Sequence, residues 1–259
     1  MFGSRSNRRP FSSTKSLRLA CCCGPLALLA AASAARAGLS YTLTDLGSVP
    51  GGSASNPYAI NNLGQVVGQD SVAGQSVAFE YSAGSMQALN VPAGPGNGAS
   101  GINDAGQIVG QYSLVGFIYS GGTAQTIPLV PHGINDAGQV VGDANSHAVL
   151  YQSGSVKDLG TLGGAGSTAS AINNAGQVVG SAHVSSGDSH AFLYAGGAMQ
   201  DLGTLGGTGS EARGINDAGQ VVGDSTLRGS SDEEAFLYTN GKMIGLGGFG
   251  AGDSGAEGI

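Results

Sequence analysis

The sequence predicts an all-β protein, a β-propeller-like array of four-stranded antiparallel blades with about five full repeats and a partial sixth. A motif of nine residues recurs at steps of 32 to 44 residues, and each repeat holds short apolar runs separated by glycine turns. The 259 residues include 48 glycines and no tryptophan, yet 41% are apolar, which is typical of a folded, turn-rich β protein. A β-solenoid is the alternative architecture, although solenoid rungs vary less in length than these repeats.

The centre of each repeat is a predicted β-hairpin. Its pattern is Ile-Asn-Asn/Asp-x-Gly-Gln-Val/Ile-Val-Gly, found at residues 60–68, 102–110, 134–142, 172–180 and 215–223, with a partial repeat at 254–259. Asparagine suits the first position of a type I turn, and glycine accepts the left-handed conformation at the fourth position of a three-residue hairpin. The predicted turn residues are Asn61 and Gly64, Asn103 and Gly106, Asn135 and Gly138, Asn173 and Gly176, and Asn216 and Gly219. The Val-Val-Gly that follows is the second strand.

The other strands of a blade keep a fixed order around this hairpin. Serine and alanine upstream of the isoleucine, as at Ser167 and Ala169, mark the first strand. The fourth strand contains Asp-Leu-Gly, most clearly at Asp158–Gly160 and Asp201–Gly203. The apolar runs Val-Val of the second strand and Ala-Phe-Leu-Tyr of the third strand do not alternate with polar residues, which indicates burial on both faces, as in stacked blades. The third strand is predicted at the aromatic pentamers Val77–Tyr81, Val115–Tyr119, His147–Tyr151, His190–Tyr194 and Glu234–Tyr238.

Residues 1–37 have the features of a signal peptide. A basic segment with the pair Arg8-Arg9 precedes an apolar stretch at 19–32, and Ala35-Arg36-Ala37 matches a cleavage site for small residues. The mature repeat domain is then 38–259, and we expect it to be exported to the periplasm, the cell surface or the extracellular medium. The arginine pair leaves the general secretory and the twin-arginine routes both open.

The composition of the mature domain argues against several classes of function. All three cysteines lie at 21–23, within the signal, so the mature domain has no disulfide and no cysteine ligand or nucleophile. Removal of the signal leaves 4 basic residues against 17 acidic ones, a net charge of −13. Such a surface repels phosphate groups, so nucleic acid and anionic membranes are not expected partners. No stable membrane span is expected after signal removal.

The third and fourth strands carry a pair of specific motifs. His190-Ala191-Phe192-Leu193-Tyr194 is followed by Asp201-Leu202-Gly203, and the same blocks recur in fixed order over residues 41–259. They resemble the HAF-repeat family of probable extracellular bacterial proteins, which is named for its His-Ala-Phe block. The third repeat departs from that pattern with Val149, and the second has Val115-Gly116-Phe117. The resemblance implies an exported, surface-associated protein and implies no activity or site residues.

One turn position gathers possible oxygen ligands from several repeats. Asp104, Asp136 and Asp217 are weak calcium candidates there, because exported acidic proteins often bind calcium through oxygen-rich loops. Each turn offers only two neighbouring side-chain oxygens, whereas calcium takes six or more ligands, so a turn-forming role is favoured. No other metal site and no cofactor is predicted.

No catalytic residues are predicted. Asp158 and Asp201 resemble the paired carboxylates of a glycosidase, and Ser254 lies in a Gly-Asp-Ser-Gly motif. His147 and His190 share one repeat position. All of these residues occupy positions that recur from repeat to repeat, which favours an architectural role. The charged residues that break the repeat lie in predicted loops between the second and third strands, at 69–76, 181–189 and 224–233.

These observations predict an exported, non-catalytic repeat protein that acts as a surface binding or structural module. Its partner, an extracellular protein or a glycan, stays unidentified, and the alternatives are a polysaccharide-acting enzyme on a propeller scaffold and a calcium-stabilised structural module. Residues 41–47 match a fourth strand and 254–259 match a first strand, so we expect the two to share one blade. We favour a truncated chain over a closed five-bladed ring with loose ends. An open ring exposes strand edges that invite self-association.

Overall fold

The computed structural model describes residues 43–92, 95–248 and 252–259, and the signal peptide predicted at 1–37 lies outside them. The described residues form twenty β-strands and no helix. The strands make five four-stranded antiparallel sheets, each built from four consecutive strands. The all-β class with four-stranded blades is therefore confirmed.

The strands of the first three sheets have the following bounds. They are β1 (Asn56–Ile60), β2 (Val66–Val72), β3 (Gln75–Ser82), β4 (Ser85–Ala88), β5 (Gly98–Ile102), β6 (Ile108–Tyr112), β7 (Val115–Ser120), β8 (Thr123–Ile127), β9 (Val130–Ile134), β10 (Val140–Ala144), β11 (His147–Gln152) and β12 (Ser155–Asp158). The last two sheets have longer first strands, and their strands are β13 (Gly163–Ile172), β14 (Val178–Val184), β15 (Ser189–Ala195), β16 (Ala198–Gly203), β17 (Gly206–Ile215), β18 (Val221–Leu227), β19 (Glu233–Thr239) and β20 (Lys242–Gly245).

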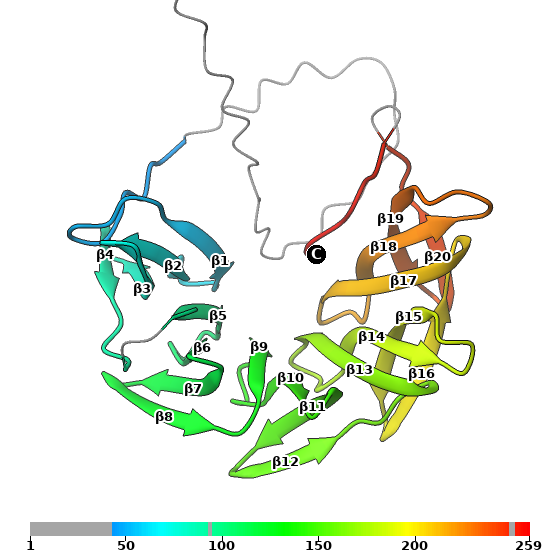
Figure 1. Cartoon of the computed structure of the whole chain (residues 1–259), viewed down its shortest axis with the longest axis horizontal. Helices are drawn as coiled ribbons and strands as arrows, with labels where there is room; N and C mark the ends of the chain where they lie inside the picture. The colour runs from blue at the N-terminus through cyan, green and yellow to red at the C-terminus, as the bar shows by residue number, and fades with distance from the viewer. Residues whose placement is uncertain (1–42, 93–94, 249–251) are drawn as a thin grey trace, which may run out of the picture.

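The five sheets surround a central axis like the blades of a propeller (Figure 1). The first strand of each sheet lies nearest to the axis, and the fourth strand lies outermost. The array is open between β1 and β17, where residues 252–259 run beside the fifth sheet. The chain thus has the predicted propeller arrangement and not the alternative solenoid, and its five sheets do not close on one another.

Each repeat centre forms the same hairpin turn. In the fourth repeat the Gly176 N–H donates to the Asn173 carbonyl at 3.0 Å, and the Asn173 N–H donates to the Gln177 carbonyl at 3.0 Å. Gly176 has a φ of 75°, in the left-handed region that favours glycine. Asn173 Oδ1 accepts from the Gln177 N–H at 2.9 Å, so the asparagine side chain closes the turn that it begins. Corresponding turns begin at Asn61, Asn103, Asn135 and Asn216.

The glycine that ends Val-Val-Gly is required by the neighbouring first strand. The pairing of that strand shifts by one residue between Ala169 and Ala171, which brings its backbone close to Gly180. A Cβ atom on Gly180 would lie 2.0 Å from the Thr168 carbonyl oxygen, far inside van der Waals contact. The same approach, at 2.1 Å or less, occurs at Gly68, Gly110, Gly142 and Gly223.

Apolar side chains fill the spaces between neighbouring blades. Between the third and fourth sheets, Val141, Ala148 and Leu159 pack with Phe192 and Tyr194. Burial of a phenylalanine side chain contributes roughly 2–3 kcal/mol, so the aromatic third strands are a major source of stability. The central phenylalanine is 0% exposed in four blades, at Phe79, Phe117, Phe192 and Phe236.

Asp70 is a buried carboxylate on β2 that holds the segment preceding β1. It is 1% exposed and accepts hydrogen bonds from the N–H groups of Val49 at 2.8 Å, Ala54 at 3.2 Å and Ser71 at 2.6 Å. Burial raises the pKa of Asp70, but the hydrogen bonds that its ionised form accepts outweigh burial and hold this pKa below the ordinary value. Asp70 is therefore charged in the folded protein down to acidic pH.

Replacement of Asp70 by asparagine is expected to lower the free energy of unfolding by about 1–3 kcal/mol at neutral pH, because buried N–H groups lose an acceptor. The lowered pKa means that the carboxylate stabilises the fold above its ordinary pKa and loses this effect as the pH falls through the folded value. Urea unfolding at roughly pH 7 and roughly pH 2.5 should therefore show a smaller difference between the two proteins at the lower pH. Asp232→Asn, at an exposed position, is the control. A difference that is the same at both pH values would contradict this assignment.

Candidate functional site: the axial pocket and the bonds between blades

The repeat turns meet near the axis and line a pocket of about 170 Å³. Each of the five repeats contributes its isoleucine, its asparagine and the following asparagine or aspartate, and Ile259 adds to the lining. The pocket lies where the first strands end and the turns begin. Its volume is below the roughly 300 Å³ of the smallest typical small-molecule sites, so it suits water or a small ion rather than a sugar.

In the first four blades, the first asparagine of the turn links its blade to the next one. Asn135 is 3% exposed, and its Nδ2 donates both to Gln139 Oε1 at 2.7 Å and to the Asn173 carbonyl at 3.0 Å. The same donation to the carbonyl of the next turn, at 3.0 Å each, joins Asn61 to Asn103, Asn103 to Asn135, and Asn173 to Asn216. These residues form what we call the axial asparagine ladder, which joins all five blades.

The next residue of each turn forms a second ladder around the pocket. The Asp104 N–H donates to Asp136 Oδ1 at 2.9 Å, and the Asp136 N–H donates to Asn174 Oδ1 at 3.0 Å. Asn62 and Asn174 donate in the same way to Asp104 and Asp217, at 2.9 and 2.8 Å. The sequence pattern predicts these residues in turns, and it carries no signal that their side chains reach the next blade.

The three calcium candidates, Asp104, Asp136 and Asp217, lie in this second ladder. All of their carboxylate oxygens accept hydrogen bonds, with Asn62 Nδ2 donating to Asp104 Oδ2 at 2.8 Å and Asn174 Nδ2 donating to Asp136 Oδ2 at 2.8 Å. In the part of the chain that the structure describes, no three or more His, Cys, Asp or Glu residues are grouped so as to hold a metal ion. The carboxylate oxygens of these residues therefore already serve bonds between neighbouring blades.

Calcium is expected to leave the stability unchanged, because the candidate oxygens already serve the bonds between blades. Thermal unfolding in millimolar calcium and in excess chelator should give midpoints within about 2 °C of each other. A larger rise with calcium, absent in an Asp136→Asn variant, would instead place a calcium ion at the pocket.

The His-Ala-Phe and Asp-Leu-Gly motifs are joined by a histidine–aspartate pair in two blades. His190 Nδ1 lies 2.9 Å from Asp201 Oδ2, and His147 Nδ1 lies 2.7 Å from Asp158 Oδ2. Asp158 Oδ1 also accepts from the Gly160 N–H at 2.8 Å. This backbone bond, followed by the His147 ring, holds the pKa of Asp158 below its ordinary value. The pair fixes the end of the fourth strand beside the start of the third.

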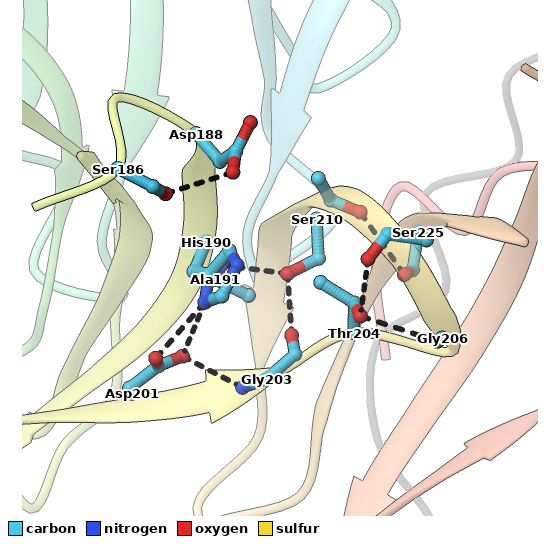
Figure 2. A network of polar contacts seen from close by, with 12 residues as sticks. Ser186, Asp188, His190, Ala191, Asp201, Gly203, Thr204, Gly206, Ser210 and Ser225 are labelled. Carbon is cyan, nitrogen blue, oxygen red and sulfur yellow. Dashed lines mark hydrogen bonds and ion pairs between the residues drawn. The ribbon is translucent and has the colours of Figure 1, made fainter. Parts of the chain in front are cut away.

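A serine from the next blade completes the arrangement (Figure 2). Ser210 Oγ accepts from the Ala191 N–H at 2.8 Å and donates to the Gly203 carbonyl at 2.6 Å. The first strand of the fifth blade is thereby pinned to the third and fourth strands of the blade before it. Ser167 and Ser254 make corresponding pairs of bonds with the blades that precede them.

In the fifth blade, a different residue pair supplies the carboxylate that bonds the glycine N–H at the end of the fourth strand. Glu234 stands where the fourth blade has His190, and Gly245 stands where that blade has Asp201. Glu234 Oε1 accepts from the Gly247 N–H at 2.8 Å, as the aspartate does elsewhere. A Cβ atom on Gly245 would lie 2.2 Å from this oxygen, so the glutamate carboxylate fills the place of the absent aspartate side chain.

The structure gives each remaining catalytic candidate an architectural partner. Asp158 and Asp201 belong to different blades, and each is bonded to the histidine of its own blade. Ser254 Oγ accepts from the Ala235 N–H at 3.1 Å and donates to the Gly247 carbonyl at 3.2 Å. The serine of the Gly-Asp-Ser-Gly motif thus joins the segment at 254–259 to the fifth blade.

At least half of each segment predicted as a loop, at 69–76, 181–189 and 224–233, is strand, so the loop prediction is wrong outside the tips of these segments. Strand β14 continues to Val184 and pairs with β15 as far as His183 opposite Ser189. Antiparallel ladder bonds therefore outweigh the weak strand propensity of aspartate and alanine there. Only short tips project from these three segments, at 73–74, 185–188 and 228–232.

One charged cluster also breaks the repeat, on the fifth blade. Arg213 Nε donates to Asp224 Oδ1 at 2.5 Å, and Arg213 Nη2 lies 3.2 Å from Glu211 Oε2. The bond to Asp224 raises the pKa of Arg213, and burial raises the pKa of Glu211. Arg213 is thus paired with one carboxylate on its own strand, β17, and one on β18.

Comparisons with known proteins bear on the fold. No protein-family model and no curated protein matches the chain. Among solved structures, the chain is similar to TolB from Acinetobacter baumannii, with a TM-score of 0.54 and 13% identity over 78% of this chain and 55% of that one. The chain spans about half the length of this neighbour, and the likeness shows the β-propeller fold. Within the described ranges, no helix is long and apolar enough to cross a membrane.

Proposed function

We propose that the chain is a non-catalytic binding or structural module that works outside the cytoplasm, as a member of the HAF-repeat family. One observation carries the proposal: the recurring polar side chains are occupied in joining strands and blades. The axial asparagine ladder, the histidine–aspartate pairs and the inter-blade serines all have protein partners. The basic, apolar and cleavable pattern of residues 1–37 supports export.

The tips between the second and third strands are the best candidates for ligand contact. They lie at the end of the blades opposite the turns that line the axial pocket, since the second strand runs away from those turns. In the second and third blades the tips are two-residue turns, at 113–114 and 145–146, whereas the fourth and fifth blades have longer tips at 185–188 and 228–232. Loops on a rigid scaffold are where binding residues concentrate.

A binding screen tests this proposal. The purified protein is screened against immobilised glycans and extracellular proteins, and each ligand found is tested again on a variant whose tip at 185–188 is replaced by the Asn-Ser turn found at 145–146. The proposal expects at least about tenfold weaker binding by that variant, with unchanged thermal unfolding. Leu114→Ser, in a short turn of another blade, is the matched control and should bind normally.

The enzymatic alternative makes the opposite prediction. Turnover of a polysaccharide, abolished by Asp158→Asn or Asp201→Asn at unchanged stability, would overturn the non-catalytic assignment. The same two substitutions leave ligand binding intact if these carboxylates only hold the ends of the fourth strands.

A further inference from the structure

A sixth blade position is half-built in the gap between the fifth and first sheets. Residues 254–259 lie where the first strand of a following blade would lie, since a Cβ atom on Gly214 would be 3.0 Å from Gly258 Cα. Gly133 has the same relation to the next blade, at 3.6 Å from Ala171 Cα. Ile259 also lines the axial pocket beside the isoleucines of the five repeat centres.

Serine hydrogen bonds like those between the other blades hold the segments on both sides of this gap at the positions of blade strands. Ser254 Oγ accepts from the Ala235 N–H and donates to the Gly247 carbonyl, which pins the segment at 254–259 to the fifth blade. On the other side, Ser55 Oγ donates to the Gly47 carbonyl at 2.8 Å. Gly47 therefore stands where the fourth strand of a preceding blade ends.

No described residue lies at the two middle strand positions of this sixth blade. Ser167 and Ser210 each accept a hydrogen bond from a third-strand N–H, of Ala148 and Ala191 respectively. Ser55 makes the matching donation to the fourth strand, and no third-strand N–H of the described chain reaches it. Its hydroxyl oxygen is thus set to accept from an incoming strand.

Both axial ladders also stop at this gap. Asn173 Nδ2 reaches the Asn216 carbonyl, and the Asn174 N–H reaches Asp217 Oδ1. Within the described ranges, no sixth turn follows to accept the next bond from Asn216 Nδ2 and from the Asp217 N–H. A turn of the same sequence at the sixth position would continue each ladder by one bond.

The first strand of the first blade is uncovered toward the gap, whereas Leu46 and Val49 pack against the outer part of this blade. Pro57 on β1 is exposed, whereas the residues at the same repeat position, Ala99, Ala169 and Ala212, are 0% exposed. In the fourth blade this position packs with the second and third strands of the preceding blade, which contribute Val141 and Ala148. The uncovered surface thus matches the two strands that the sixth position lacks.

From these observations we infer that the gap binds one β-hairpin that carries the second and third strands of the repeat, Asn-Asn/Asp-x-Gly-Gln-Val-Val-Gly followed by x-Ala-Phe-Leu-Tyr. Its second strand pairs with residues 254–259, and its third strand pairs with residues 43–47. The glycine of Val-Val-Gly is essential, because in all five blades this position approaches the first-strand backbone too closely for a side chain. The inference does not depend on the function proposed above.

The geometry selects a hairpin over other occupants. A single extended peptide pairs with only one of the two flanking segments and leaves the other edge unpaired. A second folded copy offers no hairpin of this kind, because all twenty of its described strands are already paired within its own sheets. A hairpin satisfies both edges, both ladders and Ser55 together.

A peptide with the sequence of residues 173–195 tests the inference, since it contains the turn, the second strand and the third strand of the fourth repeat. Labelled peptide is titrated with the full chain, and its binding is followed by fluorescence anisotropy, sedimentation and thermal unfolding. The inference expects a 1:1 complex and an unfolding midpoint that rises with peptide concentration.

Two controls separate insertion from non-specific adhesion. A peptide carrying Gly180→Ala should bind at least about 100-fold more weakly, because its Cβ meets the first-strand backbone. The full chain carrying Pro57→Glu should fold normally, because this side chain is exposed, and should bind the peptide at least about tenfold more weakly. Equal binding of the two peptides, no binding at all, or a dimer of the chain that excludes the peptide would each overturn the inference.

Discussion

Gly180→Ala is expected to destabilise the protein by about 3 kcal/mol or more, although it adds a single methyl group. The new Cβ would lie 2.0 Å from the Thr168 carbonyl oxygen, and this oxygen belongs to backbone that is paired on both sides of a bulge. The clash can be relieved only if the first and second strands of the fourth blade separate. Chemical unfolding of the purified variant, or its soluble yield if it does not fold, measures the effect.

Gly209→Ala is the matched control for this substitution. Gly209 lies on β17 with no positive φ, and a Cβ there would be 3.6 Å from the Ser189 carbonyl oxygen, an ordinary contact. We expect this variant to unfold within about 0.5 kcal/mol of the parent. Equal effects of the two substitutions would show that the close approach at Gly180 does not govern stability.

Asn135→Ala is expected to lower the free energy of unfolding by about 2–4 kcal/mol, because one buried amide makes three hydrogen bonds. Asn135 Nδ2 donates to Gln139 and to the Asn173 carbonyl, and its Oδ1 accepts from the Gln139 N–H at 3.0 Å. Alanine leaves both the turn and the next blade without these partners. Urea unfolding measures the loss, and Asn90→Ala, at an exposed residue outside the strands, serves as the control. A loss below about 1 kcal/mol would reduce the axial asparagine ladder to a minor contribution.

The blades themselves were predictable because their signals are local. Asparagine and glycine three residues apart specify the hairpin at Asn173 and Gly176 through backbone conformation alone. The apolar pentamer at His190–Tyr194 identifies a buried third strand, and the structure has β15 there. The spacing of the repeats then favours stacked sheets over solenoid rungs.

The bonds between blades were not predictable, because their partners are far apart in the sequence. Asn135 reaches Asn173 across 38 residues, and nothing in the turn sequence distinguishes this bond from one within the turn. The replacement of the histidine–aspartate pair by Glu234 and Gly245 in the fifth blade was not predictable for a similar reason. Each residue alone looks like a departure from the repeat, and only the fold shows that the glutamate carboxylate takes the place of the missing aspartate.

The two ladders around the axis supply natural reporters of how the molecule opens. The N–H groups of Asn62, Asp104, Asp136 and Asn174 each donate to a side chain of the following blade. Such an amide exchanges its hydrogen with solvent only after the two blades part, so each of the four measures the opening of a single interface. Residue-resolved exchange in deuterated water would therefore rank the four interfaces by their opening free energies and show whether the array frays from one end or comes apart as a unit.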